Sequence, residues 1–300
     1  MFPASAPEPE SMIARLSQEQ DIIRRRIIQD IQKITGRKLI SYIARFDHPG
    51  GNILPDDVPL FSDMMSSLNF PSELDLMINS PGGIVEVTEK IVSMIRDYVK
   101  SLIVIIPESA KSAATLIALA SDEILMGYTS EIGPIDPQIV VGVDPTIRQP
   151  VFRPAWSYIN SLRRLEEELR ERVSDPNILI PLIHRIDPTL LDVAHNAISY
   201  AKTLAAQWLV RYMKLKPEDA ERIANDLSDV SRNLSHSRPI RAQEAKRMGL
   251  NVNVLKGDSD LWKLLYELYL RSREALQGNR VKVIENEKTS IFQEAIMMRA

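Results

Sequence analysis

The stretch ELDLMINSPGGIVEVTEKIVSMIRDYVKSLIVIIPESAKSAATLIALASDEILMG, residues 73–127, alternates short apolar runs with stretches of helical character. The apolar runs, Leu74 to Ile78, Leu102 to Ile106 and Glu123 to Met126, have the length expected of buried strands. Two helices are expected between them. One runs from about Ser112 to Ala120, and the other carries an apolar face at helical spacing, made of Ile84, Val87, Ile91, Met94 and Tyr98. Alternating strands and helices predict an α/β fold with a mainly parallel sheet covered by helices.

The sequence on either side of this stretch divides into further segments. Residues 1–36 are expected to be a flexible start and an amphipathic N-terminal helix, because Leu16, Ile23, Ile27, Ile31 and Ile34 recur at helical steps. Residues 37–150 should form the core, with 133–150 loop-like. A helical insertion is expected over 151–230. Residues 231–300 should return to the core and end in a helix and a strand.

Composition and charge exclude several classes of function. The 300 residues include 37 Lys and Arg against 40 Asp and Glu, a net charge of −3, so no global basic field attracts nucleic acid. The one dense basic run, Arg24 to Arg26, is expected to be a solvated helix face. Cysteine is absent, which excludes disulfides, thiolate catalysis and cysteine-ligated metal sites. An attacking nucleophile must therefore be an oxygen or a lysine.

Neither a membrane span nor a secretory signal is predicted. The longest strongly apolar run, Leu102 to Ile106, is far shorter than the roughly 20 residues that a membrane helix needs. The Pro- and Glu-rich start, Met1 to Ser11, lacks a basic region followed by an apolar one. We therefore expect a cytoplasmic protein.

Two loops place special residues after apolar strands, whose carboxyl ends meet at one edge of a parallel sheet. In Asn79 to Gly83, paired glycines leave backbone N–H groups free to hold an oxyanion or an extended peptide; the alternative is a tight turn. The second loop, Pro107 to Thr115, puts Ser112 at the first turn of a helix. The positive end of that helix favours an attacking alkoxide, and the alternative is an ordinary N-cap serine.

These motifs carry a family resemblance. Asn79 to Gly83, Ala110 to Thr115, Ala120 to Ile124 and Gly133 to Gln138 together resemble the serine dehydrogenase proteinase family, a distant relative of the Clp proteolytic subunit and signal peptide peptidase A. The likeness extends from about Thr35 to Leu255. It implies a ClpP/crotonase-like core of repeated ββα and βαβ units with a mainly parallel sheet, plus a helical insertion. One departure is Ala114, where these relatives usually have glycine.

The resemblance also implies the site residues. Ser112, in the 37–150 segment, would be the nucleophile. The N–H of Ala113 and that of Gly83, or alternatively Gly82, would form the oxyanion hole, and Gly82 and Gly83 would bind the substrate backbone. The family is described with the order Ser, Asp, His, which Ser112, Asp136 and His236 fit. His236 would then take the serine proton and Asp136 would orient the imidazole.

Other assignments of these residues stay open. Asp136 is alternatively a turn residue before a proline, and His236 a surface loop residue. Lys111 adjoins the serine and is either a base or a solvated lysine, and Glu108 either lines the cleft or is a charged strand end. His184 and His195 lie eleven residues apart without an HExxH pattern, so no metal site is expected.

The expected function is a serine hydrolase, an intracellular endopeptidase acting through a Ser112 acyl-enzyme on a peptide or unfolded protein. No cofactor is implied, and without a GxxxxGK[ST] phosphate loop it would be ATP-independent or assisted by a partner. Relatives form rings, so the resemblance implies a homo-oligomer. Two alternatives are a catalytically weak scaffold or peptide-binding oligomer of the same fold, and a crotonase-type acyl-coenzyme A enzyme.

Overall fold

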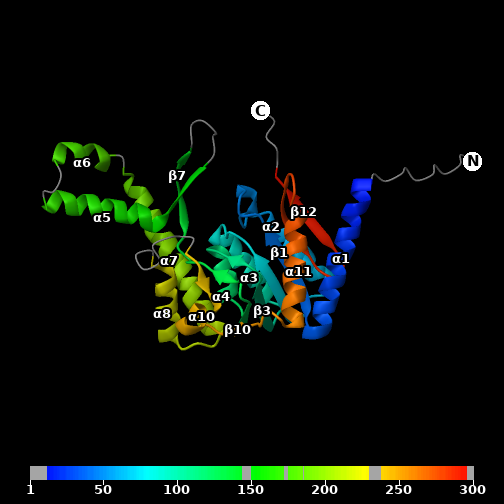
Figure 1. The fold of residues 1–300 in the computed structure, drawn as a ribbon. Helices are drawn as coiled ribbons and strands as arrows, with labels where there is room; N and C mark the ends of the chain where they lie inside the picture. The colour runs from blue at the N-terminus through cyan, green and yellow to red at the C-terminus, as the bar shows by residue number, and fades with distance from the viewer. Residues whose placement is uncertain (1–11, 144–149, 172–174, 185, 230–237, 296–300) are drawn as a thin grey trace, which may run out of the picture.

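A seven-stranded sheet crosses the molecule in the order β10-β5-β3-β2-β1-β11-β12 (Figure 1). The computed structural model describes residues 12–143, 150–171, 175–184, 186–229 and 238–295. The strands are β1 Lys38–Ala44, β2 Glu73–Asn79, β3 Ser101–Ile106, β5 Glu123–Met126, β10 Val252–Val254, β11 Arg280–Glu285 and β12 Ser290–Glu294. Neighbours from β10 to β1 are parallel, whereas β11 and β12 join antiparallel. The predicted mainly parallel α/β fold is confirmed.

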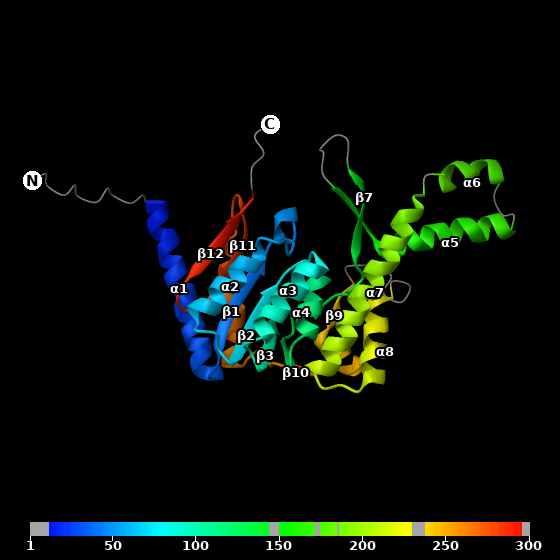
Figure 2. The same ribbon diagram turned by 180° about the vertical axis from the view of Figure 1, so that it is seen from behind.

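Helices cover both faces of the sheet (Figures 1 and 2). α1 and α11 pack on one face, and α2, α3 and α4 pack on the other, which α7 and α8 extend. Their bounds are α1 Met12–Thr35, α2 Asp57–Ser67, α3 Val85–Arg96, α4 Ala113–Leu119, α5 Ala155–Glu171, α6 Pro176–Ile183, α7 Pro188–Arg211, α8 Pro217–Ser228, α10 Ala242–Met248 and α11 Asp260–Glu274, with a 3-10 turn η1 at Pro49–Gly51. None of these described helices has the length and apolar character needed to cross a membrane.

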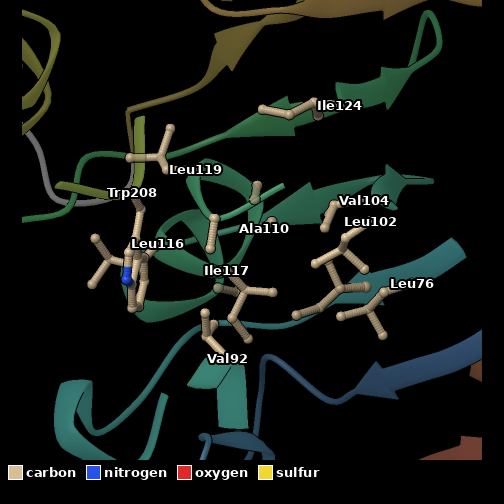
Figure 3. Packing of buried hydrophobic residues seen from close by; sticks show 14 of the residues in the cluster. Leu76, Val92, Leu102, Val104, Ala110, Leu116, Ile117, Leu119, Ile124 and Trp208 are labelled. Carbon is tan, nitrogen blue, oxygen red and sulfur yellow. The ribbon is translucent and has the colours of Figure 1, made fainter. Parts of the chain in front are cut away.

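Alternating side chains along the strands supply two separate cores. Leu76 and Val104 belong to the main cluster under α3 and α4, and Met77 and Ile105 belong to the second cluster under α1 and α11. Figure 3 shows the main cluster, in which Trp208 of α7 lies beside α4. Every residue of α4 is buried, which explains the small side chains of that helix.

A short second sheet holds the loops that carry the candidate site. Its strands are β4 Ser109–Ala110, β6 Glu131–Ile132 and β9 Ile240–Arg241, in the order β4-β6-β9. β4 pairs with β6 in parallel, and Ser80 continues the ladder by bridging to Ala110. The turn after β2, the loop after β3 and the loop before β6 are thereby tied together.

The described residues between Gln138 and Ile183, from β7 to α6, form an arm that the sequence did not predict in full. β7 Gln138–Val143 and β8 Pro150–Pro154 pair antiparallel, and α5 and α6 project away from the sheet (Figures 1 and 2). The loop-like prediction for 133–150 is therefore wrong over β7 and the start of β8, because the two strands satisfy each other's backbone groups. The second half of α7 and all of α8 pack on the main core.

Two further predictions are wrong. Arg24 is fully buried rather than solvated, because its Nε lies 3.0 Å from Oε2 of Glu285 on β11. The buried face of α3 is also rotated from the predicted one. Ile84 and Tyr98 are 41% and 50% exposed, and the buried residues are Thr88, Ile91, Val92 and Ile95.

Candidate active site

Ser112 lies on a sharp turn between β4 and α4. Its backbone has φ 50° and ψ −117°, a left-handed conformation that non-glycine residues rarely adopt. The residue occupies the N-cap position of α4, yet its side chain makes no capping hydrogen bond, and it is 7% exposed. The alternative of an ordinary capping serine is therefore not supported. In α/β hydrolases a strained strand-to-helix turn of this kind presents a nucleophilic hydroxyl.

The glycine pair lies directly against this turn. Gly82 has φ 97°, and a Cβ atom placed on it would lie 2.9 Å from Cβ of Ser112 and 2.5 Å from the carbonyl oxygen of Lys111. Ser80 holds the glycine turn against the Ser112 turn. Its N–H donates to the Ser109 carbonyl and its carbonyl accepts from the Lys111 N–H, both at 3.0 Å. Only glycine fits at position 82 without a shift of the backbone.

The backbone N–H groups of Gly83 and Ala113 belong to the turn after β2 and to the start of α4. The Gly82 carbonyl accepts from the Ile53 N–H at 2.6 Å, so the Gly83 N–H points the opposite way, because the C=O and N–H of one trans peptide group are antiparallel. The N–H of Gly82 itself donates to Oγ of Ser80 at 3.1 Å. Within the described residues no acceptor takes the N–H of Gly83 or that of Ala113. They are the two amides that the family resemblance assigns to the oxyanion hole.

The segment that leads to Asp136 is held beside the start of α4. The Gly133 N–H donates to the Ala110 carbonyl at 3.0 Å. The Thr115 hydroxyl lies 2.8 Å and 3.1 Å from the carbonyl oxygens of Ala110 and Gly133, and it accepts from the Gly133 N–H at 3.1 Å. Asp136 follows on the same segment and is fully buried.

The Lys111 side chain is paired with a carboxylate of β6. Its Nζ lies 2.6 Å from Oε1 of Glu131, and Ser109 Oγ donates to the same carboxylate oxygen at 3.2 Å. The Ser109 and Lys111 side chains therefore both reach the same carboxylate on β6. Lys111 is 8% exposed, so the solvated lysine considered from the sequence is not what the structure has.

A cavity of about 980 Å³ opens on the Lys111 side of β4, at the carboxyl ends of the central strands. Its charged walls are paired: the hydrogen bond from Arg45 lowers the pKa of Asp47 to about 2. Burial, with the hydrogen bond from the Tyr269 hydroxyl to Glu108, raises the pKa of Tyr269. Glu108 therefore lines this cavity.

The histidines of the described chain are engaged elsewhere or exposed. His48 accepts from the Gly50 N–H at 2.9 Å, His184 ends α6, and His195 is exposed on α7. His236, the expected base, lies outside the described residues. In the part of the chain that the structure describes, no group of three or more His, Asp or Glu side chains could hold a metal ion.

Sequence reasoning missed three residues that build this site. Ile53 anchors the glycine turn, Thr115 holds the segment before Asp136, and Glu131 pairs with Lys111. The sequence does show two signals. Thr115 lies in the first turn of α4, and Lys111 is next to the candidate nucleophile. Their partners, Gly133 and Glu131, lie on or next to β6, and the sequence does not show that β6 pairs with β4. The Ala114 methyl group, flagged as a departure, is fully buried in the main core cluster.

The fold and this turn define a class of protein, the ClpP-like α/β proteins. A family model described as "ClpP-like SDH-type serine proteinase" matches residues 64–290. The chain belongs to this family of SDH-type serine proteinases, as the sequence motifs indicated.

Similar proteins were found in sequence and in structure. The uncharacterized protein MJ0137 of Methanocaldococcus jannaschii is 29% identical over 182 residues, which are 60% of this chain and 53% of that protein. The uncharacterized protein MJ1495 of the same organism is 26% identical over 241 residues, 77% of this chain and 71% of that protein. A solved structure of a 1510-N membrane-bound stomatin-specific protease mutant has a TM-score of 0.42 and 17% identity, over 71% of this chain and 80% of that one.

Proposed function

We propose that this chain is a serine endopeptidase with Ser112 as its nucleophile. One observation carries the proposal: the Ser112 side chain makes no capping bond on a strained turn packed against Gly82. Backbone strain of this kind costs on the order of 1–3 kcal/mol, and it clusters at functional sites. Membership of a serine proteinase family agrees with this role.

The proposed reaction begins with attack of Ser112 Oγ on a peptide carbonyl carbon. A new C–O bond forms, and the carbonyl oxygen becomes an oxyanion that accepts hydrogen bonds from the N–H groups of Gly83 and Ala113. In this proposal His236 takes the hydroxyl proton and Asp136 orients the imidazole. When the C–N bond breaks, the leaving amine takes that proton, and the acyl-enzyme remains. Water then attacks the ester by the same route and releases the acid.

The proposed substrate is an extended peptide or an unfolded protein. The Gly83 N–H points away from Ile53, so an extended chain could pair there as an added strand. Such a chain would place a carbonyl beside Ser112, since Gly82 already touches that residue. The proposal includes a homo-oligomer, because the arm exposes large apolar side chains: Ile178 is 65% exposed and Val143 is 62% exposed.

The test is cleavage of a permanently unfolded polypeptide, followed by the appearance of new amino groups. Wild type is expected to cleave and Ser112→Ala to lose activity by at least about 10³-fold. Ser41→Ala is the matched control, because Ser41 is a fully buried serine within β1. Full activity in Ser112→Ala would overturn the proposal. A wild type that binds the polypeptide without cleaving it would favour the scaffold alternative.

A further inference from the structure

The ion pair between Lys111 and Glu131 is an unusual neighbour for a nucleophile. Lys111 precedes Ser112 directly, and its ammonium is withdrawn from water, with 10% of the side chain exposed. Removing two charges from water is costly, so such a pair is weak support for stability. The place of the Lys111–Glu131 pair next to Ser112 is better explained if the pair positions the backbone there than if it adds stability.

Lys111 connects three segments that meet at the candidate site. Its N–H donates to the Ser80 carbonyl at 3.0 Å, which joins it to the glycine turn. Its carbonyl accepts from the Ala114 N–H at 2.9 Å, which joins it to the first turn of α4. Its Nζ reaches Glu131 at 2.6 Å and the Ile132 carbonyl at 3.5 Å, which joins it to β6.

The aliphatic part of the same side chain limits the segment that carries Asp136. A Cβ atom on Gly133 would lie 2.6 Å from Cδ of Lys111, so the lysine stem fills the space that any larger residue would need. β6 thus contacts Lys111 through both charge and packing. A shift of this side chain would move the segment between Gly133 and Asp136 relative to Ser112.

We infer that Lys111 and Glu131 are positioning residues for the reaction proposed above. The pair holds the Ser112 turn and the Asp136 segment in one fixed relation, so that the hydroxyl and its partners stay aligned. In this inference neither side chain takes part in the chemical step, because the Glu131 carboxylate engages the Lys111 ammonium at 2.6 Å. The inference rests on the proposed function.

The test compares Glu131→Gln with the double variant Lys111→Met/Glu131→Gln. The rate constant for acylation of Ser112 by a fluorophosphonate probe is measured beside the thermal midpoint. Glu131→Gln is expected to lower both, because it leaves the Lys111 ammonium buried without its carboxylate. The double variant is expected to recover the midpoint, whereas its acylation rate stays about 10- to 100-fold below wild type. The reversible affinity for the probe should change little.

A control is the pair Lys38 and Glu287, whose Nζ–Oε1 distance is also 2.6 Å and whose lysine side chain is 44% exposed. The double variant Lys38→Met/Glu287→Gln should acylate at the wild-type rate. If the Lys111/Glu131 double variant recovers the acylation rate together with the midpoint, the pair is merely structural and the inference is overturned. Wild-type acylation rates in both Glu131→Gln and Lys111→Met/Glu131→Gln overturn the inference as well.

Failure of the proposed function is distinguishable from failure of this inference. If wild-type Ser112 is not acylated at all, the proposed function fails, and a crystal structure of the double variant then decides the positional role. The inference expects Ser112 to leave φ near 50° or the segment after Gly133 to shift. Unchanged backbone in both places overturns it.

Discussion

Gly82 and Ser112 are packed so closely that any side chain at position 82 would clash with Ser112. A Cβ atom on Gly82 would lie 2.9 Å from Cβ of Ser112 and 2.9 Å from the amide nitrogen of Ala113. The turn after β2 and the turn before α4 are therefore a single packed unit. The proposed oxyanion amides lie one residue beyond Gly82 and one beyond Ser112.

Gly82→Ala should damage both stability and activity. The new methyl group would lie 2.5 Å from the Lys111 carbonyl oxygen, and φ of 97° is unfavourable for alanine. We expect the free energy of unfolding to fall by about 1–3 kcal/mol. Urea denaturation measures the loss, and probe acylation should slow in the fraction that stays folded.

Gly142→Ala is the control for that substitution. Among the described residues, no heavy atom lies within 4 Å of a Cβ atom placed on Gly142 of β7. Its unfolding free energy should stay within about 0.5 kcal/mol of wild type. An equal loss in both variants would contradict the close fit at Gly82.

Thr115→Val removes a buried hydroxyl without changing the shape of the side chain. The Gly133 N–H and the Ala110 carbonyl keep their mutual hydrogen bond, but the buried Gly133 carbonyl loses the Thr115 hydroxyl. We expect a destabilisation of about 1–3 kcal/mol, measured by urea denaturation. Thr203→Val, at an exposed position of α7, is the control and should be nearly neutral.

The buried pair between Lys282 and Asp57 provides a second stability test. Nζ and Oδ2 lie 2.7 Å apart with 2% and 0% of the side chains exposed, and burial lowers the pKa of Lys282 against the opposing effect of Asp57. Lys282→Met should cost about 3–5 kcal/mol, because it strands a buried carboxylate. Lys33→Met breaks an exposed pair and should cost no more than about 1 kcal/mol. Similar losses in the two variants would refute the distinction.

Stability should decline at high pH through Tyr200 on α7. Burial, with the hydrogen bond from its hydroxyl to Glu89 on α3, raises the pKa of Tyr200 to about 12. Because the folded pKa exceeds the unfolded value of about 10, this contribution is complete below pH 10 and is lost as pH rises toward 12. Unfolding free energies across that range should fall less steeply in Tyr200→Phe. Parallel curves for the two proteins would contradict the assignment.

Local sequence patterns predicted the central fold well. The errors at Arg24 and β12 come from a distant partner and from a weak burial pattern. The strands within 73–127 were evident because each is a short, continuous apolar run. Arg24 was misjudged because its partner, Glu285, lies 261 residues away. The edge strand β12 was missed because its residues are only partly buried, so their pattern is weak.

For the candidate site, strand topology predicted which residues meet, but single contacts were beyond the sequence. Gly82 and Ser112 were expected together because each follows one of two neighbouring parallel strands, β2 and β3. The pairing of Lys111 with Glu131 depends on β4 and β6, which have two residues each and give no periodic signal. The catalytic roles of Ser112, Asp136 and His236, and that of the Gly83 and Ala113 amides, stay predictions.

The most direct measurement of the central claim is peptide mapping by mass spectrometry after reaction with a fluorophosphonate probe. The account predicts one covalent adduct, on the hydroxyl of Ser112, and no adduct in a Ser112→Ala variant that keeps the wild-type thermal midpoint. An adduct on any other residue, or a wild-type protein that stays unmodified, would contradict it.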